Sequence, residues 1–222
     1  MVIGERFMNK MMWGGWGAGI LLLAALFLLA GCGDDESAPM LEVTAKSGKK
    51  VDINGTWITD CHEADGAWRK KTLAFTGTDF SMVNQSFLTD STCGGGSKMD
   101  INAEGTLALG LEGDVTFGPS QAITTQVNYT VTTLTATANT DETAHYNGLL
   151  QLYGYEIWVA GEPQDILNLA EDGTTIDSSL IKDRILVDDG VNPNKLYKGD
   201  LSSVGADGYP TTIEVFIVYE KY

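Results

Sequence analysis

Alternation of apolar and polar residues with a period of two runs through most of the chain after residue 50, and it constrains the fold more than any other feature. The clearest segment has an apolar face made of Ile123, Val127, Tyr129 and Val131 and a polar face made of Thr124, Gln126, Asn128, Thr130 and Thr132. Leu107, Leu109 and Leu111 repeat the pattern, as do Ile213, Val215, Ile217 and Tyr219. Because successive side chains of a strand point to opposite faces, these segments are predicted to be strands with one buried face. The threonine-rich face of 124–137 is expected to point into solvent.

Glycine-containing turns separate the predicted strands at intervals typical of small antiparallel folds. The expected strands cover 55–62, 68–76, 79–89, 99–111, 121–137, 149–160, 165–169, 183–188 and 211–221. Segment 176–185 could instead hold a short helical turn. The pattern predicts an all-β domain, an antiparallel barrel of about eight strands, with a β-sandwich as the alternative.

The beginning of the chain has the layout of an export signal. Arg6 and Lys10 precede the uncharged run Ile20–Ala30, "ILLLAALFLLA", which is shorter than the roughly 20 residues that a spanning helix needs. An ordinary membrane-spanning anchor is the alternative.

The end of this run, Leu29-Ala30-Gly31-Cys32, resembles the lipobox of bacterial lipoproteins. The resemblance implies cleavage before Cys32 and acylation of its thiol, which would hold the protein on a membrane. Residue 33 is Gly rather than Asp, and in enterobacterial lipoproteins this implies the outer membrane of a Gram-negative cell envelope. The expected divisions are a signal peptide over 1–31, a flexible tether over 32–50 and a β domain over 51–222.

The composition bounds the partners. The formal net charge is −16, and no basic stripe with interleaved aromatic residues is present, so nucleic acid is not an expected partner. If Cys32 carries lipid, Cys61 and Cys93 remain as a pair in an oxidising compartment, and a disulfide between them is expected.

The segment Gly55-Thr56-Trp57, "GTW", resembles the first motif of lipocalins, in which the tryptophan lies across the closed end of an eight-stranded barrel. The resemblance gives Gly55 and Trp57 the role of a barrel floor. The arginine that closes this end in lipocalins has no counterpart, since Lys221 and Tyr222 are the last residues. A closer resemblance is to lipocalin-like lipoproteins of Gram-negative envelopes, carried by "GTWITDC", "DSTC", "LYKGD" and "ADGYPTTIEVFIVYEKY".

No sequence signature of catalysis is present, so no enzyme and no cofactor are expected. His62 with Glu63 and Asp65 could form a weak metal site, and the turns 171–177 and 188–194 could form weak calcium sites. Local hydrogen bonding by turn residues is the favoured explanation for both turns, so no metal site is predicted.

Two functional classes remain. The first is a barrel that binds a small apolar or amphipathic ligand, with the strand 149–160 presenting Tyr153 and Tyr155 on one face and Trp158 on the other. The second is a structural or interaction protein with a filled core that acts through its outer surface.

Overall fold

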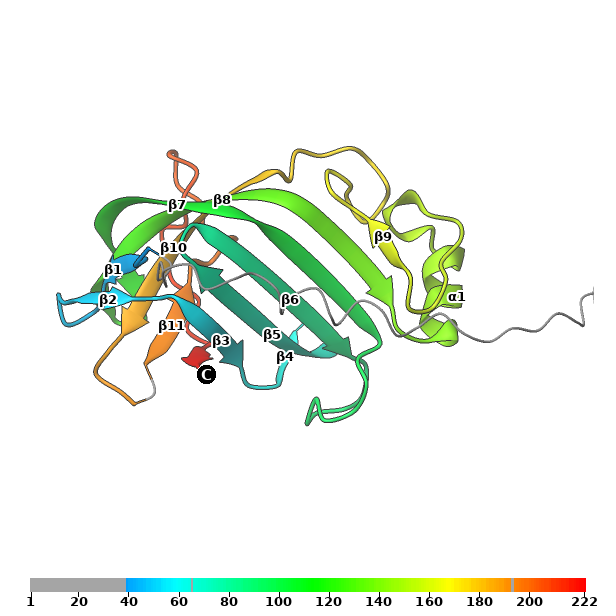
Figure 1. Cartoon of the computed structure of the whole chain (residues 1–222), viewed down its shortest axis with the longest axis horizontal. Coiled ribbons are helices and arrows are strands. Elements are labelled where there is room, and N and C mark those ends of the chain that lie inside the picture. Colours follow the sequence, from blue (N-terminus) through cyan, green and yellow to red (C-terminus); the bar gives the residue numbers. More distant parts are fainter. Residues whose placement is uncertain (1–38, 65, 193) are drawn as a thin grey trace, which may run out of the picture. The chain divides into compact units, whose positions relative to one another are not determined.

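Eight strands close into an antiparallel barrel in the computed structural model, which describes residues 39–64, 66–192 and 194–222. They are β3 (Gly55–Thr59), β5 (Ala67–Thr76), β6 (Asp79–Phe87), β7 (Met99–Phe117), β8 (Ser120–Ala138), β10 (Leu180–Asp188), β11 (Lys195–Lys198) and β12 (Tyr219–Lys221). Each pairs with the next in chain order, and β12 pairs with β3, where Tyr219 lies opposite Thr59. The long strands run side by side in Figure 1. The prediction of an all-β barrel is confirmed, and the sandwich alternative is wrong.

Smaller elements are added to the eight barrel strands. Strand β4 (His62–Ala64) pairs with β5, and β9 (Pro163–Asp165) pairs with β8. Helix α1 (Asp141–Leu149) begins after Thr140, whose side chain accepts a hydrogen bond from the backbone N–H of Thr143 at 3.2 Å. A short 3₁₀ helix, η1 (Leu152–Gly154), follows. Helix α1 and β9 lie at one end of the barrel, opposite β1 and β2 (Figure 1).

The hairpin of β1 (Glu42–Thr44) and β2 (Lys50–Asp52) belongs to the folded domain. Val43 and Ala45 have no exposed surface, and the backbone N–H of Lys46 donates to the carbonyl of Val187 at 2.8 Å. The predicted flexible tether over 32–50 is therefore wrong for its second half, because alternating apolar residues there pack into the core. Residues 1–38, which include the predicted signal peptide and Cys32, lie outside the described residues.

The strand predicted over 149–160 is wrong. This region holds the end of α1, η1 and a loop, and it buries Tyr153 and Trp158 together against Ala136 of the barrel wall and Ile166 of the loop after β9. The two rings expected on opposite faces thus share one cluster, since an irregular turn can point both inward where a strand cannot.

Other strand boundaries differ from the prediction because pairing partners lie far away in sequence. Strand β10 begins at Leu180, so the helical turn weighed for 176–185 is wrong. Of the strand predicted over 211–221 only β12 forms, while Ile213 makes an isolated bridge and packs in a separate outer cluster. Residues 166–169 follow β9 as a loop.

A β-bulge explains why Leu111 does not share a face with Leu107. Between Leu109 and Glu112 strand β7 has two residues where β8 has one, so the alternation reverses and Leu111 is 76 % exposed.

The expectation of a solvated threonine face is wrong at its start, where Thr124 and Thr125 are buried. The Thr124 hydroxyl donates to the carbonyl of Gly113 at 2.9 Å and accepts a hydrogen bond from the Arg184 guanidinium at 3.4 Å.

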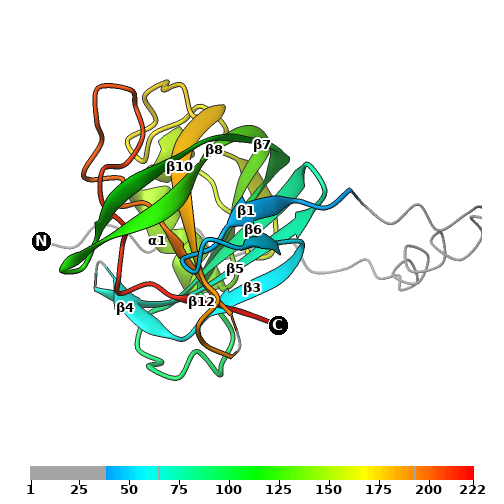
Figure 2. The same ribbon diagram turned by 90° about the vertical axis from the view of Figure 1, so that its left-hand side faces the viewer.

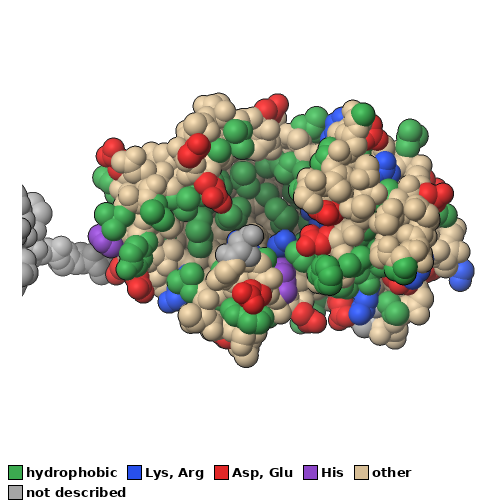
Figure 3. Space-filling model, turned by 180° about the vertical axis from the view of Figure 1, so that it is seen from behind, with side chains coloured by type: hydrophobic (Ala, Val, Ile, Leu, Met, Phe, Trp, Pro, Cys, Tyr) green, Lys and Arg blue, Asp and Glu red, His purple; other side chains and the backbone are tan. Residues whose placement is uncertain are grey.

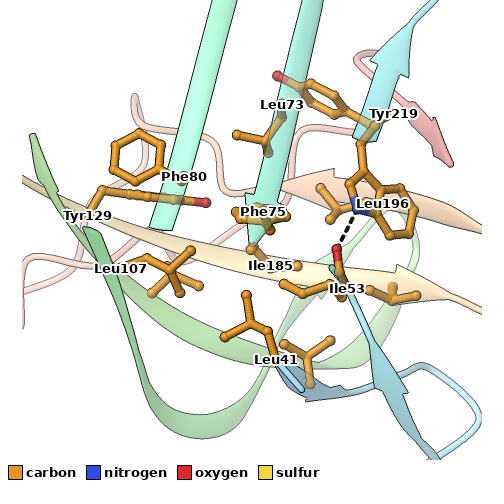
Figure 4. Packing of buried hydrophobic residues seen from close by; sticks show 14 of the residues in the cluster. Leu41, Ile53, Leu73, Phe75, Phe80, Leu107, Tyr129, Ile185, Leu196 and Tyr219 are labelled. Carbon is orange, nitrogen blue, oxygen red and sulfur yellow. Dashed lines mark hydrogen bonds between the residues drawn. The ribbon is translucent and has the colours of Figure 1, made fainter. Parts of the chain in front are cut away.

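The main core fills the end of the barrel nearest the β1–β2 hairpin. Leu41, Ile53, Phe75, Ile185 and Leu196 pack there from the hairpin and opposite walls (Figure 4). Figure 2, viewed toward this end, shows β1 lying across the barrel. We call this the closed end and the remainder the open half.

A disulfide joins Cys61 and Cys93, with 5.7 Å between their Cα atoms, which confirms the predicted crosslink. It ties the start of β4 to the loop between β6 and β7. In that loop the carboxylate of Asp90 accepts hydrogen bonds from the Thr92 hydroxyl and from the backbone N–H groups of Thr92 and Gly95. These bonds lower the pKa of Asp90 to about 2, so its carboxylate stays ionised and keeps these hydrogen bonds at any ordinary pH.

Candidate functional site: a pocket in the open half of the barrel

The closed end is floored by Trp57, which has no exposed surface. Its indole N–H donates to the Ile53 carbonyl at 2.8 Å, the bond drawn as a dashed line in Figure 4. Gly55 begins the strand with a φ of 111°, a conformation that favours glycine.

Lys221 completes this floor, which the sequence did not lead us to expect. Its ammonium lies 5.5 Å from the centre of the Trp57 ring and donates to the Asp52 carbonyl at 3.2 Å. A cation thus covers the floor tryptophan.

Above the floor, the open half contains a pocket of about 370 Å³. Barrel residues that point inward form one side of it, and the loop between β11 and β12 forms the other. Its apolar wall comes from Met82, Ile181, Leu201 and Ile217, and its polar wall includes Lys71, Asn84, Asp183, Lys198, Glu214 and Tyr219. Figure 3 shows the molecule hollowed on one face, with hydrophobic side chains on the wall of the hollow.

A second, apolar cavity of about 30 Å³ adjoins the pocket on the side of the core. Met82, Ile181 and Lys198 line both spaces, while Leu73, Phe80 and Tyr129 belong to the smaller one. The smaller cavity has room for roughly one water molecule, so the interior is packed at the closed end and hollow in the open half.

An ion pair is buried between the two spaces. The ammonium of Lys198 lies 3.0 Å from the carboxylate of Asp183, whose side chain has no exposed surface. The other carboxylate oxygen of Asp183 accepts hydrogen bonds from the backbone N–H groups of Arg184 at 2.7 Å and Gly199 at 2.9 Å. Burial is the largest single effect and opposes the charge of Lys198, but Asp183, with help from Tyr129 and Tyr219, more than offsets it and holds the pKa of Lys198 above its usual value.

Tyr129 and Tyr219 lie close enough to Lys198 and Asp183 to interact with both charges, and their hydroxyls are directed into the barrel (Figure 4). Lys198 lies 5.2 Å from the centre of the Tyr129 ring. Burial raises the pKa of both Tyr129 and Tyr219. Among the described residues the buried Tyr129 hydroxyl and the side-chain oxygen of Asn84 have no hydrogen-bond partner, an arrangement that costs stability.

These tyrosines predict a pH dependence. A pKa raised by folding means that the folded state holds the tyrosine proton more tightly. The contribution of these tyrosines to stability is therefore complete below about pH 10 and is lost as the pH rises further. We expect part of the tyrosine ionisation, followed by ultraviolet absorbance, to appear only together with unfolding. Tyr129→Phe should remove part of that step without lowering stability at pH 7. Full ionisation of all tyrosines while the fold persists would contradict this account.

The residues considered for metal binding have other roles where they are described. His62 lies next to the Asp60 carbonyl, at 3.0 Å from Nδ1, while Asp65 lies outside the described residues. The carboxylate of Asp172 accepts from Thr174 in its own turn, and Asp188 pairs with Lys46 at 3.0 Å. Among the described residues no three His, Cys, Asp or Glu side chains gather as a metal site would require.

The pocket residues Lys71, Asn84, Asp183, Lys198 and Glu214 were missed from the sequence. A signal existed for two of them. Ile181, Asp183, Ile185 and Val187 alternate along one face of β10, and Leu196 and Lys198 do so along β11. A charged residue in phase with an apolar strand face is a candidate for the interior.

No protein-family model matches this chain, and no curated protein matches it. In the part of the chain that is described, no helix has the length and apolar character needed to cross a membrane.

Proposed function

We propose that this protein is an envelope lipoprotein whose barrel binds a small amphipathic ligand in its open half. The observation that carries the proposal is the pocket of about 370 Å³, which joins an apolar wall to a few convergent polar groups. Its size lies at the lower end of the range of about 300–1,000 Å³ that is usual for small-molecule sites. The packed floor limits the ligand to the open half, so a short chain fits better than a long one.

The ligand proposal is tested by filling the pocket. Met82→Trp places a bulky ring where both cavities meet, whereas Val83→Trp adds the same ring to the opposite face of β6. We expect the first variant to weaken binding of the fluorescent probe N-phenyl-1-naphthylamine about tenfold or more, equivalent to about 1.4 kcal/mol, and the second to leave it unchanged. Equal binding by both variants would contradict a ligand inside the barrel.

The anchor proposal rests on the lipobox around Cys32. Cys32→Ala removes the thiol that would be acylated, so the precursor should keep its leader and take up no radioactive palmitate. The unaltered chain should be shortened and labelled. Equal labelling of both chains would overturn the anchor, and it would not bear on ligand binding.

One observation favours the interaction class as a second candidate. Large apolar side chains are exposed on α1 and the loop after it, with Leu149 at 66 %, Leu150 at 75 % and Ile157 at 75 %. Exposed apolar groups close together are typical of binding surfaces. The double variant Leu150→Asp with Ile157→Asp should abolish co-purification of an envelope partner and leave probe binding intact. If co-purification is unaltered, this second function is wrong.

A further inference from the structure

We infer that the pocket selects ligands with an uncharged polar head, such as a hydroxyl or an amide, over carboxylates. The inference rests on the proposed ligand binding and adds the chemical class of the ligand. It follows from the charges and the unpartnered polar atoms that surround the pocket.

The buried charges beside the pocket are already compensated. The Asp183 carboxylate and the Lys198 ammonium, 3.0 Å apart, form a pair that is neutral as a whole. Two backbone N–H groups hold the carboxylate in place, so it does not give way to an arriving anion. A ligand carboxylate beside Lys198 would also lie close to Asp183, and it would lose its hydration without gaining an uncompensated cation.

The rest of the pocket does not reverse this balance. Its charged lining residues are two lysines and three carboxylates: Lys71, Lys198, Asp183, Asp200 and Glu214. Asp200 accepts hydrogen bonds from the hydroxyl and the N–H of Ser202, which lower its pKa and keep it ionised. The whole chain has a formal net charge of −16, so an anion also meets an unfavourable field on approach.

The described polar groups that lack a hydrogen-bond partner also favour an uncharged head. The side-chain oxygen of Asn84, on the pocket wall, accepts hydrogen bonds, and the Tyr129 hydroxyl, on the adjoining cavity, both donates and accepts. A ligand hydroxyl or amide has both a donor and an acceptor and can satisfy these atoms. A carboxylate has no proton to donate to Asn84.

The test uses the purified full chain and three ligands with the same alkyl chain. Calorimetric titration at pH 7 compares 1-octanol, octanoate and octylamine. We expect octanol to bind at least about tenfold more tightly than octanoate. Octanoate should bind more tightly as the pH falls below the pKa of its own carboxyl group, because its neutral form then enters.

One variant should shift the ligand preference from the alcohol towards the carboxylate. Asp183→Asn keeps an oxygen for the two backbone donors but leaves Lys198 uncompensated, so octanoate should gain at least about tenfold relative to octanol. Glu104→Gln also removes one negative charge, but from an exposed side chain on β7, and it should not alter the ratio of octanol to octanoate affinity.

Each outcome decides between the claims. Octanoate binding the unaltered chain as tightly as octanol would overturn the preference for an uncharged head over a carboxylate and leave ligand binding standing. If none of the three ligands binds at any pH tested, the proposed function itself fails. Should Asp183→Asn not fold, the octanol-to-octanoate ratio and its pH dependence in the unaltered chain still decide.

Discussion

Val43→Asp is expected to unfold the domain, with a loss of more than about 4 kcal/mol in the free energy of unfolding. Val43 has no exposed surface, and it packs from β1 into the cluster at the closed end. A carboxylate there would lose its hydration with no partner to replace it, which is among the most destabilising of single substitutions. Urea denaturation followed by circular dichroism measures the loss.

The matched control is Met40→Asp, three residues earlier, where the side chain is 72 % exposed. This change should alter stability by less than about 0.5 kcal/mol. The pair of variants separates two descriptions of residues 39–50. If they formed the flexible tether that their composition indicates, both substitutions would be harmless, and this result would contradict the hairpin as part of the core.

Trp57→Ala should lower the free energy of unfolding by about 4 kcal/mol. The change removes the largest fully buried side chain of the barrel floor, together with its hydrogen bond to Ile53 and its contact with Lys221. Large-to-small substitutions of buried aromatic residues cost about 3–5 kcal/mol, because surrounding atoms close the cavity only in part.

Trp68→Ala is the control of the same chemistry, since Trp68 lies at the other end of β5 and is only half-buried. We expect less than half the loss of Trp57→Ala. Similar losses for the two variants would show that Trp57 is no more than another aromatic residue and would remove its role as a floor.

The barrel itself could be predicted from local sequence because most of its walls are hairpins of neighbouring strands. β5, β6, β7 and β8 pair with their neighbours in chain order. The clear alternation in 123–131 placed Val127, Tyr129 and Val131 correctly in the core. The crosslink followed from the number of cysteines once Cys32 is assigned to the lipid anchor of an exported protein.

Closure of the barrel could not be predicted in the same way. It depends on pairs such as Leu180 with Thr130 and Lys221 with Trp57, which are separated widely in sequence. Propensity and alternation do not determine such registers, because they depend on the packing of the whole sheet.

The segment 149–160 was mistaken for a strand because its alternating aromatic residues outweighed the helix signals that precede it. Thr140 followed by Asp141 and Glu142 is a common start for a helix, and α1 begins there. Tyr153 and Trp158 are buried by an irregular turn rather than by a pleated strand. Gly105 is a similar case, since a Cβ there would lie 2.0 Å from the Thr130 carbonyl oxygen, a constraint that only the paired strands reveal.

The most direct test of the central claim, a ligand inside the open half of the barrel, is methyl NMR of the complex with 1-octanol. We expect nuclear Overhauser contacts from the alkyl chain to the methyl groups of Met82 and Ile181, which line both cavities. Val83, on the outer face of β6, should show none. Contacts confined to Leu149, Leu150 and Ile157 on the outside would contradict the claim.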